Sequence, residues 1–195
     1  MRKSKASQIV PRLMYFNTKQ LYTPALAIYE FNERSLIVDT ETVGAGGTTE
    51  IIEIAFGDAK GEIVFQSLVR PVFNTRTRLP KESRFEREEL EAAPYWTDIW
   101  PQVRELVRNR LLIAYNAGFD RRALAASCSR HNHQTEERGW RCAMQLVKQV
   151  AGVKKSLPLA EACALYGLPG GTHRAAADVR ATYNLLNALK NSIRD

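Results

Sequence analysis

Two acidic residues stand one residue apart near the end of an apolar segment, in the sequence SLIVDTETV. Side chains at positions i and i+2 of a β-strand point to the same face, so Asp39 and Glu41 are expected to project together, about 6–7 Å apart along the backbone. Burying two such carboxylates without compensation is costly or forces one of them to take up a proton. A divalent cation is therefore the natural partner, and hard oxygen ligands favour Mg²⁺ or Mn²⁺. The pair alone leaves open an exposed strand end with solvated acids.

Two further acids and one histidine strengthen the case for a metal site. Asp120 follows the apolar segment LLIAYNAGF, and the carboxyl ends of sheet strands commonly carry functional sites. Asp178 stands near the start of the last helical segment, five residues after His173. The stretch GLPGGTH before it is rich in glycine, which predicts a mobile histidine. A histidine can take a proton from water near neutral pH, because its reference pKa is about 6.5.

Five segments of the chain are candidates for the strands that position these side chains. Residues 35–41, 50–58 and 61–71 are β-branched and closely spaced, which predicts three consecutive antiparallel strands. The continuous apolar run within residues 110–120 predicts a strand that is buried on both faces and leads into a helix near Phe119. Residues 139–147 fit either a further short strand or the start of a helix.

Helical spacing of apolar residues is found in three other regions. Residues 82–110 show it, with Pro94 and Pro101 expected at helix starts or breaks. Residues 156–167 predict a short helix ended by Gly167, and residues 175–192 predict a long terminal helix. The aromatic residues of the first region have the spacing of core residues: Tyr95, Trp96 and Trp100.

The composition is that of an ordinary globular protein, and its excess of positive charge suits either a polyanionic partner or a solvated basic arm. The chain has 195 residues, enough for one domain. A helix needs about 18 apolar residues to cross a bilayer, and no apolar run is that long, so no membrane association is expected. Its three cysteines are odd in number and scattered, which favours a reducing, cytoplasmic location. The net charge is +7, and residues 1–34 hold six Lys or Arg against two Glu. We therefore expect a basic extension over residues 1–34 and one domain over residues 35–195.

The segments IVDTET, YNAGFD and HRAAAD resemble the three motifs of the DEDDh family of 3′-5′ exonucleases. This family includes the proofreading exonuclease subunits of bacterial replicative DNA polymerases. The resemblance runs from about Ser35 to Leu189 and includes EAAPYW before the second motif and LPLAEACALYGLPGGTH before the third. It implies an α/β, ribonuclease-H-like fold: a mixed five-stranded sheet, with three antiparallel strands and then parallel strands, flanked by helices.

The resemblance also implies an activity and a set of catalytic residues. Two divalent cations, Mg²⁺ or Mn²⁺, would be held by four acids, and His173 would be the general base. The reaction would be hydrolysis of DNA from a single-stranded or frayed 3′ end, releasing nucleoside 5′-monophosphates, as in DNA replication and repair. The implied metal ligands are Asp39, Glu41, Asp120 and Asp178.

The family comparison further implies where the terminal nucleotide would bind. Asn116 and Phe119 would support the site, although plain core packing is the favoured interpretation of Phe119. The chain departs from the family pattern after the first motif, where Ala45 replaces a bulkier apolar residue and GAGG adds flexibility. Three residues would lie against the 3′-terminal nucleotide, with backbone amides on its hydroxyl: Thr42, Val43 and Gly44.

Two rival functions remain open at this point. The first is an exonuclease that trims RNA from its 3′ end, because the bond that is cut is the same and nothing in the sequence reads a 2′ hydroxyl. The second is a binding module on a nuclease fold that docks on a polymerase or another protein through residues 1–34. A zinc site at Cys128, His131 and His133 is not favoured, because no fourth ligand stands nearby.

Overall fold

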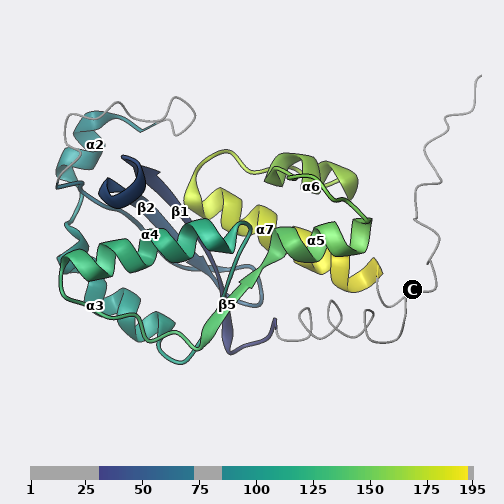
Figure 1. The fold of residues 1–195 in the computed structure, drawn as a ribbon, viewed down its shortest axis with the longest axis horizontal. Coiled ribbons are helices and arrows are strands. Elements are labelled where there is room, and N and C mark those ends of the chain that lie inside the picture. Colours follow the sequence, from purple (N-terminus) through teal and green to yellow (C-terminus); the bar gives the residue numbers. More distant parts are fainter. Residues whose placement is uncertain (1–30, 73–84, 193–195) are drawn as a thin grey trace, which may run out of the picture.

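The computed structural model of the protein describes residues 31–72 and 85–192, and Figure 1 shows their arrangement. One mixed sheet of five strands, in the order β3-β2-β1-β4-β5, forms the centre of the fold. This confirms the expected α/β class and the five-stranded sheet. The strands are β1 (Ser35–Val43), β2 (Glu50–Gly57), β3 (Ile63–Leu68), β4 (Leu111–Ala114) and β5 (Gly139–Cys142).

The pairing of the strands places β1 at the middle of the sheet. β1 runs antiparallel to β2, and β2 runs antiparallel to β3, as the short connections between them predict. β1 is parallel to β4, and β4 is parallel to β5, so the sheet changes direction as expected. In the β1–β2 register Asp39 lies opposite Ala55, and Glu41 lies opposite Glu53.

The helices confirm the predicted order, with one local difference. The described part of this region, residues 85–110, holds two helices, and Pro94 lies in the break between them. The expectation for Pro101 is wrong, because this residue lies inside α3. Pro101 and Thr97 are both exposed, so water can bond the carbonyl that the proline leaves without a donor. The helices are η1 (Gly46–Thr48), α2 (Arg87–Ala92), α3 (Trp96–Val107), α4 (Ala117–Arg130), α5 (Ala143–Ala151), α6 (Leu159–Leu165) and α7 (Ala175–Ser192).

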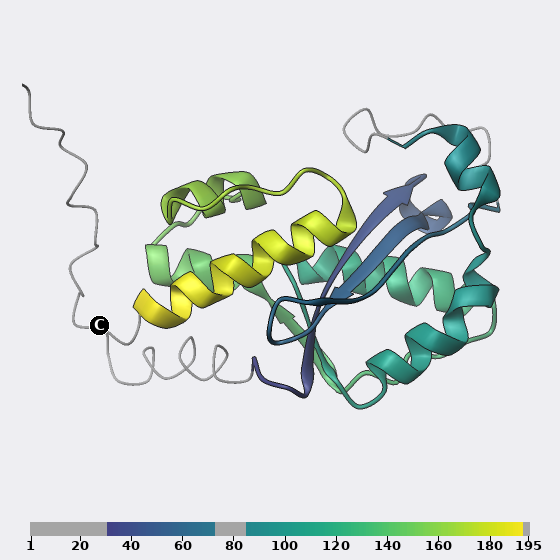
Figure 2. The same cartoon turned by 180° about the vertical axis from the view of Figure 1, so that it is seen from behind.

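Helices cover both faces of the sheet. α3 and α4 lie on one face, and α7 crosses the other face with α5 and α6 beside it, as Figure 2 shows from behind. Alternation along β1 serves the two cores: Leu36 and Val38 pack toward α3 and α4, whereas Ile37 packs toward α7. The odd-numbered positions of β1 therefore face α7, and Asp39 and Glu41 continue this series.

Residues 31–34, which precede the predicted boundary at residue 35, pack against the domain. Phe31 is buried in the core beneath α7, where its ring meets that of Tyr183 at 6.1 Å between centroids. The carbonyl of Arg34 accepts a hydrogen bond from the amide of Leu111. Most of the predicted basic extension, residues 1–30, lies outside the described residues.

The aromatic residues at the start of α3 follow the prediction in part. Trp96 and Trp100 are buried, as their spacing predicts. Tyr95 is exposed instead, because it lies at the N-cap of α3, and its ring packs under the guanidinium of Arg70. Within the part of the chain that the structure describes, no helix is both long and apolar enough to span a bilayer.

Candidate active site

Four acids from three separate segments converge where β1 meets the N-termini of two helices. Asp39 and Glu41 lie on β1, Asp120 lies in the first turn of α4, and Asp178 lies in the first turn of α7. The charges of the other three each raise the pKa of Asp39, and such mutual influence requires proximity. The fold thus brings together all four of the acids that the sequence singles out.

Asp120 is anchored to β1 by a buried pair of hydrogen bonds. One carboxylate oxygen accepts from the Thr40 amide at 3.0 Å and from the Thr40 hydroxyl at 2.8 Å. Burial raises the pKa of Asp120 to about 7, and the hydrogen bonds from Thr40 oppose this rise because they favour the charged form. These contacts tie the start of α4 to the central strand.

Asp178 is held against the loop before α7. Its Oδ1 accepts a hydrogen bond of 2.8 Å from the amide of Thr172. A Cβ atom added to Gly171 would lie 2.1 Å from the same oxygen, so only glycine allows this close approach. At Gly171 the structure therefore supplies a packing reason for glycine, in addition to the mobility expected of the segment.

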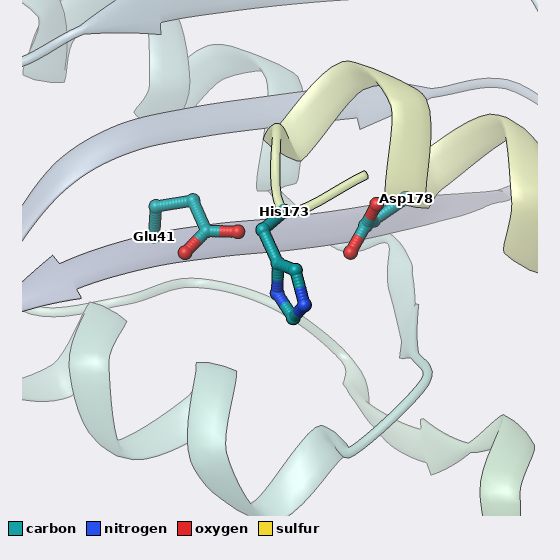
Figure 3. A group of neighbouring side chains, drawn as sticks. All are labelled: Glu41, His173 and Asp178. Atoms are coloured by element: carbon teal, nitrogen blue, oxygen red, sulfur yellow. The ribbon is translucent and has the colours of Figure 1, made fainter. Parts of the chain in front are cut away.

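His173 lies beside the carboxylates. Figure 3 shows its imidazole between Glu41 and Asp178, at the end of the loop that precedes α7. One ligand atom from each of these three side chains lies within 4.8 Å of the others. The backbone of His173 has a φ of 56°, in the left-handed region that a residue with a side chain seldom occupies. The imidazole is exposed to solvent and so accessible to a substrate.

The electrostatics of the site are those of buried carboxylates that repel one another. Burial raises the pKa of Asp39 well above its usual range, and the charges of Asp120, Asp178, Glu41 and Glu53 raise it further. Burial, then Asp178 and Glu53, raise the pKa of Glu41 to about 7. Burial is also the main cause that raises the pKa of Asp178. At neutral pH these groups resist full ionisation unless positive charge is supplied.

The donor set fits a hard divalent cation. Carboxylate oxygens are the ligands that Mg²⁺ and Mn²⁺ prefer, and a cation would offset the burial and the repulsion that raise these pKa values. Across residues 31–72 and 85–192, one group of metal-type side chains is close enough to share an ion, namely Glu41, His173 and Asp178. Cys128, His131 and His133, for which a zinc site was not favoured, do not form such a group. The ring of His133 instead stacks on that of Trp100, with 5.3 Å between the ring centroids.

The predicted substrate-binding residues lie directly beside the acids in the chain, in different environments. Val43 is buried against Ile52, Phe85 and Leu90, so its side chain is already packed within the protein. Phe119 is 38% exposed, and the expectation that it packs in the core is wrong, because the first turn of α4 points it to solvent. The other three are partly or fully exposed: Thr42, Gly44 and Asn116.

The glycine-rich loop after β1 is held by hydrogen bonds. Arg130, at the end of α4, donates to the carbonyls of Gly47 and Thr49. Within the loop the Thr48 hydroxyl donates to the carbonyl of Ala45 at 2.8 Å. The sequence predicts added flexibility here, and the structure shows a short helical turn, η1, tied to α4.

Glu53 is a residue of this region that the sequence reasoning missed. It is only 7% exposed, lies opposite Glu41 on β2, and raises the pKa of both Asp39 and Glu41. The signal was present: Glu53 interrupts the apolar segment IIEIAF at a position that pairs with the first acids. An acid within a buried strand requires a partner, which makes such a position informative.

Comparison with known proteins identifies the family. A family model described as Exonuclease (RNase_T) matches residues 36–186, and the chain belongs to this exonuclease family. It is 30% identical over 169 residues to the exonuclease CP81 of Escherichia phage 186, covering 79% of this chain and 87% of that protein. The expectation of an exonuclease, a hydrolase of phosphodiester bonds, is therefore confirmed. The family also implies the use of divalent metal.

A second relative is much longer than this chain. It is described as a bifunctional exonuclease/endonuclease protein, MT2247, of Mycobacterium tuberculosis (strain CDC 1551 / Oshkosh). The two are 28% identical over 183 residues, which cover 86% of this chain and 28% of that protein. The similarity thus extends over about a quarter of the relative's length.

Solved structures confirm the fold. A 3′-exonuclease in a study of 3′-end specific recognition of a histone mRNA stem-loop has a TM-score of 0.65 at 17% identity, covering 85% of this chain and 68% of that one. The cell-death related nuclease 4 (CRN-4) has a TM-score of 0.63 at 18% identity, covering 80% and 63%. The expected ribonuclease-H-like architecture is confirmed by these neighbours. A specific likeness to proofreading subunits is not among these findings.

Proposed function

We propose that the protein is a metal-dependent 3′-5′ exonuclease that acts on single-stranded or frayed DNA ends and releases nucleoside 5′-monophosphates. The observation that carries this proposal is the convergence of Asp39, Glu41, Asp120 and Asp178 beside an exposed histidine. Exonuclease relatives and the 3′-exonuclease neighbours support the direction of attack.

The four acids would hold two divalent cations, Mg²⁺ or Mn²⁺. Such ions lower the pKa of a water and neutralise charge on the attacking and leaving oxygens of the phosphodiester. The protein's own contribution is the fixed arrangement of the carboxylates. Asp120 is oriented by Thr40, and Asp178 is oriented by the Thr172 amide, so neither has to be ordered when the ions bind.

His173 is proposed as the general base. Its imidazole is exposed and lies beside Glu41 and Asp178, so one ring nitrogen can take the proton of the attacking water. The backbone amides at Thr42 and Gly44 would contact the free 3′ hydroxyl. Asn116 would support the site, and the exposed ring of Phe119 would stack on a base of the substrate.

Digestion of oligonucleotides that are labelled at one end tests the proposal. With Mg²⁺ or Mn²⁺, a 3′ label should appear at once as a mononucleotide, while a 5′ label should move through a ladder of shortening products. Chelator should stop both reactions. Early release of the 5′-terminal nucleotide, or equal activity in chelator, would refute the proposed direction or metal dependence.

Hydrolysis of RNA is a second candidate, and one structural neighbour favours it. The 3′-exonuclease with a TM-score of 0.65 was studied for recognition of a histone mRNA stem-loop. Matched DNA and RNA oligonucleotides, single-stranded and with paired or mismatched 3′ ends, separate the two candidates. A preference of kcat/KM for RNA would replace DNA as the proposed substrate.

A further inference from the structure

Glu53 on β2 forms a contact with Arg174, the residue that directly follows His173. The Nε atom of Arg174 donates to both carboxylate oxygens of Glu53, at 3.1 and 3.3 Å, and Nη2 lies 3.1 Å from Oε1. The backbone amide of Ala175, the first residue of α7, donates to Oε2 at 2.8 Å. Glu53 therefore links strand β2 to the two residues that follow His173.

The arrangement continues to a third element. The guanidinium of Arg174 lies over the ring of Phe85, 4.7 Å from its centroid, and Phe85 packs in the small core beside α2 with Val43. A guanidinium held between a carboxylate and an aromatic face has little rotational freedom. This contact fixes Arg174 more firmly than a surface ion pair would.

The backbone of His173 is thus fastened on both sides. Before it, the amide of Thr172 donates to Asp178, and after it, Arg174 and the amide of Ala175 are held by Glu53. Between these points His173 has a φ of 56°, a conformation that a residue with a side chain seldom adopts and that persists only where the surroundings enforce it. Strain maintained between two anchors is typical of a side chain whose direction matters.

We propose that Glu53 is a positioning residue, which acts through Arg174 and the start of α7 to aim His173 at the acid cluster. This inference rests on the proposed function, because it assigns a purpose to the direction of the general base. A role for Glu53 as a metal ligand is less consistent with the geometry, since Arg174 and Ala175 already bond both of its oxygens.

The chain offers a matched pair of substitutions for the test. Glu53→Gln keeps the size of the side chain and an acceptor for Ala175 but removes the charge that holds Arg174. Glu50→Gln is the control: Glu50 is equally buried on the same strand, and its Oε1 accepts the amide of Val72 at 2.8 Å, a contact that involves none of residues 172–176. Arg174→Lys serves as the conservative variant, because it keeps the charge and loses the fork.

The first measurement is amide hydrogen exchange over residues 172–176 in chelator, which reports the anchor without any catalysis. Glu53→Gln should raise exchange there at least tenfold, while Glu50→Gln leaves it within about twofold. Unchanged exchange in Glu53→Gln would overturn the inference whatever the activity of the protein.

The second measurement is steady-state hydrolysis over a range of oligonucleotide concentrations, with Mn²⁺ binding measured by a separate titration. Glu53→Gln should lower kcat at least tenfold and change KM and the Kd for Mn²⁺ by less than about twofold. The kcat of Arg174→Lys should lie between those of Glu53→Gln and the wild type. Glu50→Gln should match the wild type. Weaker Mn²⁺ binding in Glu53→Gln would assign Glu53 to the metal site and contradict the proposal.

A double-mutant cycle with His173 separates this inference from the proposed function. If Glu53 acts through His173, Glu53→Gln should change kcat by less than about twofold in a His173→Ala background. A full tenfold loss in that background would refute the positioning role. Near-normal activity of His173→Ala alone would instead refute the general base and leave the exchange result to judge the anchor.

Discussion

The two halves of β1 perform different tasks within nine residues. Residues 35–38 are almost wholly buried, and Leu36, Ile37 and Val38 join the cores on both faces of the sheet. Residues 39–41 continue the same alternation with Asp39 and Glu41, whose pKa values are raised by burial and by neighbouring acids. The first half stabilises the fold, whereas the second half lowers its stability and carries two of the proposed metal ligands.

The largest effect should follow from removing an acid of the second half. Asp39→Ala and Asp178→Ala should each lower kcat at least about a thousandfold, because each removes a proposed metal ligand. Melting temperatures in chelator should stay equal or rise, since the repulsion is relieved. Steady-state hydrolysis and circular dichroism measure both quantities.

Asp58→Ala is the control for these variants. Asp58 accepts the amides of Lys60 and Glu62 in the turn after β2, so its loss should affect stability slightly and kcat not at all. A near-normal rate in Asp39→Ala or Asp178→Ala would remove that residue from the site.

Replacing the proposed base should have the next largest effect. His173→Ala should lower kcat by about 10²–10⁴, the usual contribution of a general base. The pH profile of kcat should lose one limb in the variant, because the group that accepts the proton from water is gone. A pH profile of unchanged shape would contradict the assignment.

A substitution in the first half of β1 should show the opposite pattern. Leu36 is fully buried, so Leu36→Ala should lower the free energy of unfolding by about 2–5 kcal/mol. The kcat of the molecules that remain folded should stay within about twofold of the wild type. Urea unfolding measures the stability, and rates divided by the concentration of folded protein measure kcat. A large loss of kcat in the folded fraction would contradict the division of β1 into a stabilising and a catalytic half.

The smallest predicted effect is the pH dependence of stability without metal. Glu41 and Asp120 have a pKa of about 7 in the folded protein, above the ordinary values of these acids near 4. The folded state therefore holds protons that the unfolded state has lost, and stability should fall as pH rises from about 4 to about 7.

Thermal melts at several pH values test this dependence. In chelator the melting temperature should be lower at pH 8 than at pH 5 by at least about 3 °C, and Mn²⁺ should shrink the difference because the ion replaces the protons. Asp39→Asn should also reduce it. A melting temperature in chelator that rises steadily across this range would show that the acids are not destabilising.

Local patterns predicted the elements of this fold well. The terminal helix was predicted over residues 175–192 and is observed over that range, because its apolar spacing is regular. Residues 139–147, left open between strand and helix, contain both, β5 followed by α5. A run of nine residues is too short for periodicity to separate two elements.

The site was predictable where acids interrupt apolar runs, and less so where tertiary contacts decide. The spacing of Asp39 and Glu41 indicated their shared face, but the anchoring of Asp120 by Thr40 joins residues 80 apart in sequence. Glu53 was missed because its partner, Arg174, lies 121 residues away. The exposure of Phe119 depends on how α4 packs, which no local pattern specifies.

Isothermal titration of the apo protein with Mn²⁺ tests the central claim most directly. The account predicts binding to the wild type that releases protons near pH 7, because acids with raised pKa values must ionise to hold the ion. In Asp39→Asn and Asp178→Asn both the binding and the proton release should be strongly reduced, and in Asp58→Asn they should not change. Equal binding in all four proteins, or no binding to the wild type even with a nucleoside 5′-monophosphate present, would contradict the account.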